Sequence, residues 1–249
     1  MARASLVLVD RSARVTNELP GSQGTRVAGL VPNFYVAFGE LREAHKRFAS
    51  AGRNFELALL AFYTGDLRTT KVELPEVEGL ERGSLPVAML LMLHTGRLHE
   101  AEGARRRIDI PQEGRPGLAI LDGELAIASG RRSKGMALLE QGLNASIGAT
   151  LYLIAAEDLA RLYREQHKLP EALRVLQHAA SLPSAPNFQG AFHMRIQLRL
   201  MELYRELGRS DDADKIEVEL RKRLILADPD HPILLALKGR DHPAIIAPR

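Results

Sequence analysis

Apolar residues recur along this chain with the period of an α-helix. In residues 156–166, Leu159, Leu162 and Tyr163 fall at positions i, i+3 and i+4. The same spacing runs from Leu200 to Leu207. Each segment therefore predicts a helix with one apolar stripe. Runs of β-branched and aromatic residues, which strands favour, are almost missing, so the pattern predicts an all-α fold.

A common outline recurs in six copies along the chain. Each copy has a turn residue, often followed two places later by Leu and always followed five places later by a small residue. The turn residues are Gly39, Gly65, Gly96, Gly130, His167 and Gly208, and the small residues are Ala44, Thr70, Ala101, Gly135, Ala172 and Ala213. Glycine after a helix can adopt the left-handed conformation that ends it. We expect the small residues where two helices cross closely, because a larger side chain there would overpack the contact by about 1–3 kcal/mol. The outline predicts about six αα-hairpins that must stack to bury their apolar faces.

In residues 153–181 the large, small and aromatic positions resemble those of the tetratricopeptide repeat (TPR) family. The matching residues are Leu159, Ala160, Tyr163, Ala172, Leu176 and Ala179. Residues 194–222 and the second helix of 33–51 show the same resemblance. It implies a right-handed α-solenoid of about six TPR-like αα-hairpins. Arg105, Arg132 and Gly135 depart from the family pattern, and the spacing between turn residues runs from 26 to 41. Because a regular TPR array repeats about every 34 residues, we expect an uneven superhelix.

The last repeats, within residues 158–179 and 199–237, also resemble the TPR regions that follow bacterial Ser/Thr protein kinase domains. The chain itself has no GxGxxG loop and no HRD or DFG motif. The resemblance implies a sensing or docking part of a bacterial signalling system, with a kinase or another signalling protein as a possible partner.

Three segments follow from these patterns. Residues 25–225 form the expected repeat array. Residues 1–24 do not fit it and are interpreted as an irregular N-terminal segment or the remnant of an upstream domain. Residues 226–249 are expected to form a capping helix near 232–239 and a tail. The longest apolar run, at 85–93, is too short to cross a bilayer, so we expect no membrane insertion. The expected location is cytoplasmic, or extracytoplasmic if a larger protein anchors the array.

Charge and composition narrow the function classes. The chain has 34 basic and 31 acidic residues, a net charge of +3, and no cysteine. Disulfides and cysteine-ligated zinc are therefore excluded. The small basic excess does not predict nucleic-acid binding. The basic clusters at 103–108 and 221–223 nevertheless keep a nucleic-acid-binding helical repeat open as the alternative function.

No motif predicts catalysis, a metal or a cofactor. His94 and His99 lie about 140° apart around a helix axis and lack the HExxH spacing that places two histidines on one face. The GRRSKG stretch at 130–135 lacks the Gly-Lys-Ser/Thr ending of a phosphate loop. We therefore expect a non-catalytic protein, with a hidden enzyme as a further alternative.

In the TPR family, the first helix of each hairpin lines the inner face of the superhelix, and that face binds a peptide or protein segment. The residues that the resemblance places there are Phe62, Tyr63, His94, Glu157, Arg161, Arg164, Glu202 and Arg205. They predict a groove that is apolar toward its N-terminal half and charged toward its C-terminal half. An acidic segment would pair with the arginines. The alternative interpretation is that the arginines and glutamates pair with one another across stacked helices.

Overall fold

The computed structural model describes residues 32–109, 115–145 and 149–239, and in these ranges the chain is all-helical with no strand. A helical segment at 32–38 comes first. The helices that follow are α3 (Leu41–Ser50), α4 (Asn54–Thr64), α5 (Leu67–Glu73), the short 3-10 helix η1 (Val77–Gly79), α6 (Leu85–His94), α7 (Leu98–Arg107), α8 (Arg115–Ala128), α9 (Arg132–Ala145), α10 (Thr150–Glu165), α11 (Leu169–Ser181), α12 (Phe188–Glu206), α13 (Ser210–Arg223) and α14 (Pro232–Lys238). The expected segment 1–24 and the end of the expected tail, 240–249, lie outside the described residues.

The six predicted turn residues all have the left-handed backbone. Five are glycines with φ between 72° and 89°, and the sixth, His167, has φ 58° and is the one described non-glycine residue with a positive φ. Each lies between two helical segments. The prediction that left-handed turns separate paired helices is confirmed.

The small residue five places after each turn is buried where helices meet. Ala44, Ala101, Ala172 and Ala213 are fully buried, as is Thr70. The sixth position holds a glycine on α9, where a Cβ atom would lie 2.6 Å from a backbone oxygen of α8. The helices α8 and α9 therefore pack too closely for any side chain at that position, which explains why residue 135 departs from the expected pattern.

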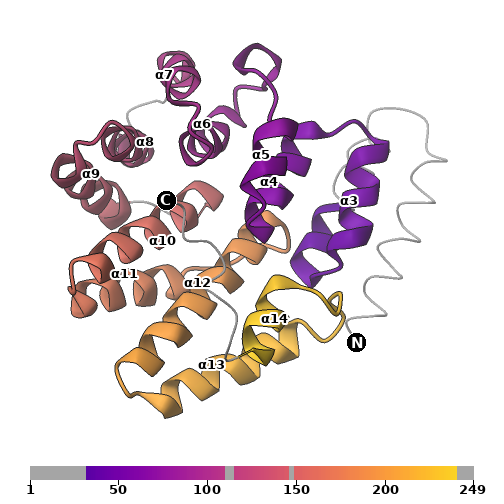
Figure 1. Cartoon of the computed structure of the whole chain (residues 1–249), viewed down its shortest axis with the longest axis vertical. Coiled ribbons are helices and arrows are strands. Elements are labelled where there is room, and N and C mark those ends of the chain that lie inside the picture. Colours follow the sequence, from indigo (N-terminus) through magenta and orange to yellow (C-terminus); the bar gives the residue numbers. More distant parts are fainter. Residues whose placement is uncertain (1–31, 110–114, 146–148, 240–249) are drawn as a thin grey trace.

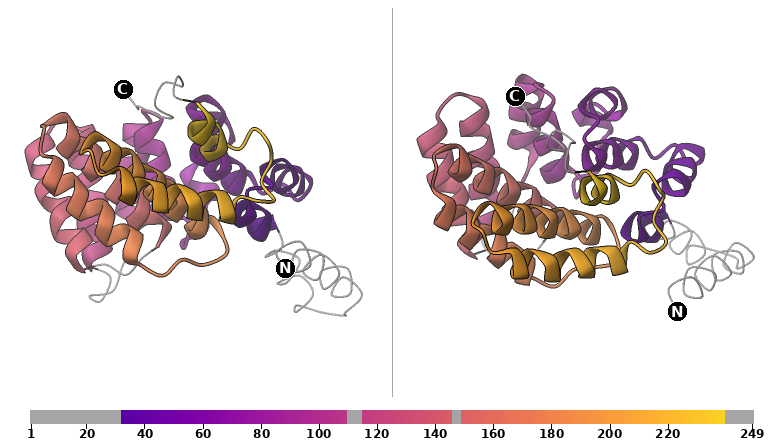
Figure 2. Two further views of the ribbon diagram at one scale, coloured as in Figure 1. Left: turned by 90° about the horizontal axis from the view of Figure 1, so that it is seen from below. Right: turned by 60° about the horizontal axis from the view of Figure 1, so that its bottom comes forward.

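Consecutive helices pack in pairs: α4 with α5, α6 with α7, α8 with α9, α10 with α11 and α12 with α13. The first helices of the pairs also pack on one another, so that α6 contacts α4, α8 and α10, and α10 contacts α12. The pairs follow an arc that brings α14 back beside α3 and α4 (Figure 1). The two further views in Figure 2 also show α14, in yellow, beside α3 and α4, in indigo.

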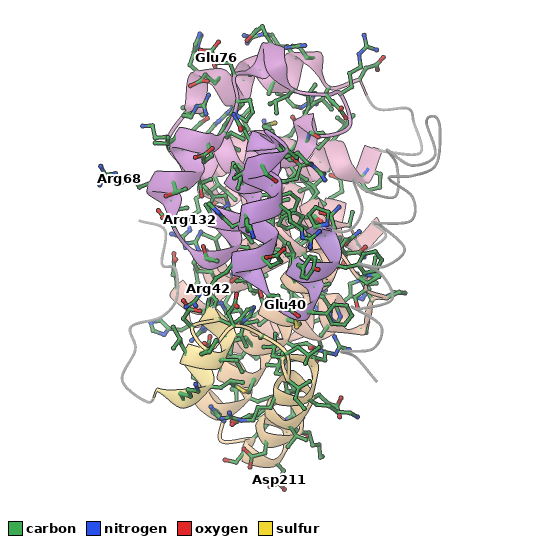
Figure 3. All side chains as sticks on the ribbon, turned by 90° about the vertical axis from the view of Figure 1, so that its right-hand side faces the viewer. Glu40, Arg42, Arg68, Glu76, Arg132 and Asp211 are labelled. Carbon is green, nitrogen blue, oxygen red and sulfur yellow. The ribbon has the colours of Figure 1, made fainter. Side chains whose placement is uncertain are left out.

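Hydrogen bonds and an ion pair join the C-terminal segment to the first hairpin, which consists of the helical segment 32–38 and α3. The backbone N–H of Asp228 donates to the carbonyl of Gly39 at 3.0 Å. The Asp228 carboxylate accepts from the backbone N–H of Arg42 at 2.9 Å. The side chain of Arg42, which is labelled in Figure 3, pairs with Asp230 at 2.8 Å. The helix expected near 232–239 is α14, Pro232–Lys238, and it closes the arc against the first hairpin. No helix among the described residues is both long and apolar enough to span a membrane.

Candidate functional site

Two adjacent acidic residues, Glu157 and Asp158, interrupt the apolar inner side of α10. The residues around them, from Tyr152 to Ala156 and from Leu159 to Ala160, are buried. Each acidic residue is the centre of a separate polar cluster, one shared with α12 and the other with α6 and α8.

The first cluster joins α10 to α12. Glu157 accepts from the Arg195 side chain at 3.0 Å and from Arg199 at 2.8 Å, and Arg199 also pairs with Glu202 at 3.1 Å. Burial alone would raise the pKa of Glu157, but the two arginines outweigh it and hold that pKa below its usual range. Glu157 and Glu202, both predicted site residues, therefore belong to one ion network at the contact between α10 and α12.

Arg195 extends this network to the end of α4. Its guanidinium donates to the carbonyls of Phe62 and Tyr63 at 3.2 Å and 3.4 Å in the last turn of α4, where the Phe62 carbonyl also accepts from the backbone N–H of Gly65. It also lies over the rings of Phe62 and Phe192 at 5.4 Å and 5.0 Å. The predicted apolar groove wall at Phe62 and Tyr63 is instead core, because α12 covers it and both side chains are at most 2% exposed. The Tyr63 hydroxyl lies 3.3 Å from Nε2 of His231, which precedes α14.

The second cluster lines a cavity of about 470 Å³ between α6, α8, α9 and α10. Its polar wall comes from His94, Glu124, Arg132, Asp158 and Arg161, and its apolar wall includes Leu93, Ile127, Ala128 and Leu162. His94 Nε2 lies 2.9 Å from the Asp158 carboxylate, and Arg161 Nη2 lies 3.4 Å from its other oxygen. The sequence prediction named His94 and Arg161 on two different hairpins, and the structure brings them together on Asp158.

Glu165 on the last turn of α10 connects the two arginines of this cluster. It accepts from Arg161 Nη1 at 2.6 Å and also pairs with Arg132 of α9. The charges of both guanidinium groups are therefore already matched by carboxylates of the chain.

Glu124 of α8 is the buried acid that has no such match. Its Oε1 is buried and makes no hydrogen bond with any described residue, and the Nε of Arg161 is also buried without a partner. Burial, followed by the charge of Asp158, raises the pKa of Glu124 well above its ordinary value, and Arg161 opposes this only in part. The pKa of Asp158 shifts the other way, since His94 and Arg161 more than offset its burial. The pKa values of the two carboxyl groups are therefore shifted in opposite directions, so that their surroundings favour the neutral form of Glu124 and the charged form of Asp158.

A larger cavity of about 730 Å³ lies at the closure between the first hairpins and α14. Its acidic groups already have partners. Asp66 accepts from Thr69 at the start of α5, and Asp228 and Asp230 bind Arg42. The polar groups of this cavity therefore serve to hold the C-terminal segment against the first helices. The cavity on α6, α8, α9 and α10 is the better candidate for a binding site, because some of its buried polar atoms have no partner.

Arg164 and Arg205, the remaining predicted arginines, pair with carboxylates on neighbouring helices. Arg164 of α10 contacts Glu206 of α12 at 2.8 Å, and Arg205 of α12 contacts Glu217 of α13. These contacts match the alternative that arginines and glutamates pair across stacked helices. The role of these residues toward a partner stays a prediction.

Sequence reasoning missed Glu124, Asp158, Arg195 and Arg199. All four are charged residues on helix faces that are otherwise apolar, such as LDGELAIA at 121–128. A charged residue within an apolar stripe could have identified them, because a buried charge needs a partner or a function.

Within the described residues, no group of three or more His, Asp or Glu side chains is placed to hold a metal ion. No protein-family model, no curated protein and no solved structure matches this chain.

Proposed function

We propose that this chain is a non-catalytic helical-repeat protein that binds a segment of another protein. The resemblance of its repeats supports a right-handed, TPR-like solenoid and a role in bacterial signalling. We propose further that the bound segment inserts a side chain into the cavity on α6, α8, α9 and α10.

The observation that carries this proposal is that polar atoms in the wall of the cavity are buried without a hydrogen-bond partner. Leaving a buried polar group without a partner costs about 1–3 kcal/mol, and Glu124 Oε1 and Arg161 Nε are both in that position. A ligand that bonds to either of them recovers part of this free energy on binding. The cavity volume of about 470 Å³ also falls in the range typical of ligand sites.

The position of the cavity favours a macromolecular ligand. It is lined by α6, α8 and α10, which are the first helices of their hairpins. In the TPR family, which these repeats resemble, the first helices form the binding face. Its rim includes Ala128 and Gly130, both exposed at the turn between α8 and α9. A chain segment lying over this turn can place one side chain in the cavity.

The test is photo-crosslinking from the cavity rim. A photoreactive amino acid replaces exposed Ala128 in one variant, and in the control it replaces Val218 of α13, which is 62% exposed. We expect crosslinks from position 128, and not from position 218, to one contiguous segment of one protein. A synthetic peptide of that segment should then bind the purified chain and compete with crosslinking. Equal crosslinks from both positions, or none, would overturn the proposal, and crosslinks to RNA or DNA would replace it with the nucleic-acid alternative.

A further inference from the structure

We infer that the cavity on α6, α8, α9 and α10 receives a primary ammonium group, the end of a lysine side chain, with Glu124 as its counter-ion. This inference rests on the proposed function, since the lysine belongs to the bound segment.

The charges around the cavity leave one place for a cation. Asp158 has Arg161 and His94 beside it, and Glu165 has Arg161 and Arg132. Glu124 is the one acid of the cavity wall without a basic partner among the described residues. It can ionise at low cost only when a cation enters from outside. An anionic ligand would instead meet the Asp158 carboxylate and two arginines that are already engaged.

The shape of the wall matches a lysine side chain. Leu93, Ile127 and Leu162 line the cavity beside the carboxyl group, and such apolar surface packs well against a chain of methylene groups that ends in a charge. A compact ammonium can donate to a single carboxylate oxygen such as the buried Oε1 of Glu124. The guanidinium groups of Arg132 and Arg161 already line the cavity, and a third planar guanidinium would have to fit beside them, whereas an ammonium is compact.

Binding then carries a proton balance. The raised pKa of Glu124 favours its neutral form in the free protein. The ligand enters as an ammonium ion, and at a pH below that pKa the carboxyl proton leaves to solvent as the ion pair forms. No bond of the ligand breaks, and the number of protons released for each ligand bound approaches one as the pH falls below the pKa of Glu124. Affinity for the ammonium group should therefore rise about tenfold per pH unit below the pKa of Glu124.

The experiment uses the full chain and small probes, so it does not depend on a partner. Nα-acetyl-lysine-N-methylamide is titrated and followed by protein NMR and by calorimetry in buffers with different ionisation enthalpies. The matched probes are the norleucine derivative, which lacks the ammonium, the arginine derivative and the glutamate derivative. We expect binding of the lysine probe with release of up to one proton, and at least tenfold weaker binding of the other three.

The variant Glu124→Gln removes the charge and keeps the shape of the neutral acid, so it should fold as the wild type does. We expect it to lose the lysine probe and the proton release. Glu219→Gln, at an exposed position of α13, is the control and should bind as the wild type does. Unchanged affinity in Glu124→Gln, equal binding of norleucine, preference for arginine or glutamate, or no binding of any probe would each overturn the inference.

The outcomes also separate this inference from the proposed function. If the lysine probe binds and position 128 captures no protein segment, the ammonium site stands and the proposed function fails. If a captured segment binds equally well after its lysines are replaced by norleucine, the proposed function stands and the ammonium site fails.

Discussion

The ion network of Glu157 yields the sharpest test of how this fold is held together. The Glu157 side chain is 14% exposed, and its two partners, Arg195 and Arg199, are 9% and 11% exposed. Glu157→Gln keeps the shape of the side chain and removes its charge. Two nearly buried guanidinium groups on α12 then face α10 without their shared carboxylate.

The size of the effect follows from what each arginine retains. Removing one member of a buried ion pair costs about 3–5 kcal/mol, because the other charge stays buried and unpaired. Arg199 still has Glu202 at 3.1 Å, and Arg195 still donates to the carbonyl of Phe62 at 3.2 Å. We therefore expect a loss of about 3 kcal/mol, at the lower end of this range. That is a large part of the 5–15 kcal/mol by which a typical domain is stable.

The assay is urea unfolding followed by circular dichroism. Glu202→Gln is the matched control, since it removes a carboxylate from the same network at a side chain that is 31% exposed. Its expected cost is at most about 1 kcal/mol. The pKa of Glu157 lies below its ordinary value of 4.5, so its contribution is fully present above pH 4.5 and is lost as the pH falls below that value. The variant should lack this acid-dependent loss.

A small effect would refute the reasoning. If Glu157→Gln and Glu202→Gln lower the free energy of unfolding equally, Arg195 and Arg199 do not depend on the Glu157 charge. The contact between α10 and α12 would then be stabilised by apolar packing alone.

Three further predictions address the turns, the close helix contact and the closure. Replacing Gly135 by Ala should destabilise the chain by about 1–3 kcal/mol, because its Cβ would meet the backbone of α8. Gly103→Ala on α7 should stabilise it by up to about 1 kcal/mol, because its Cβ would meet only the end of the Arg106 side chain at 3.9 Å; thermal unfolding measures both. Replacing His167, which has φ 58°, by Gly should stabilise the chain by about 1 kcal/mol, and Gly208→Ala, at φ 72°, should destabilise it by a similar amount in the same assay. Burial lowers the pKa of His231 to about 4 from 6.5, so the folded protein favours the neutral ring. The contribution of His231 to the free energy of unfolding is therefore full above pH 6.5 and should fall by about 3 kcal/mol as the pH drops from 6.5 to 4. Urea unfolding measured across that range should show the fall in the wild type and not in His231→Asn.

The helices and their turns could be predicted because their causes are local. A glycine column at the turns and a small residue five places later are visible in one sequence, and both reflect the backbone conformation and helix contact at a single hairpin. Even His167, the one non-glycine at a turn, occupies the left-handed conformation that its place in the column implied.

The closure of the arc could not be predicted in the same way. It depends on Asp228 reaching Gly39 and on Arg195 reaching the end of α4, contacts that join residues more than a hundred positions apart. A resemblance of single repeats carries no information about how far the array curves. The inner face was therefore expected to be an open groove, and at Phe62 it is core.

The candidate site was predictable only in part. His94 and Arg161 were identified because they occupy inner-face positions of their hairpins. Glu124 was not, since a glutamate in one helix reveals nothing about the acid that faces it from another. Its unpaired state becomes visible only when the positions of Asp158, Arg161 and Arg132 in space are known.

The closed inner face changes how a partner can be recognised. A segment lying along a continuous groove would have to displace Arg195 and Phe192 from Phe62, and would thereby expose the buried Arg195 side chain and the rings of Phe62 and Phe192. Entry through the cavity between α6, α8, α9 and α10 displaces none of these contacts. Recognition by one inserted side chain, as proposed above, therefore leaves the contacts of Arg195 and Phe192 intact, and under that proposal the charge of the inserted side chain sets the specificity rather than the length of the bound segment.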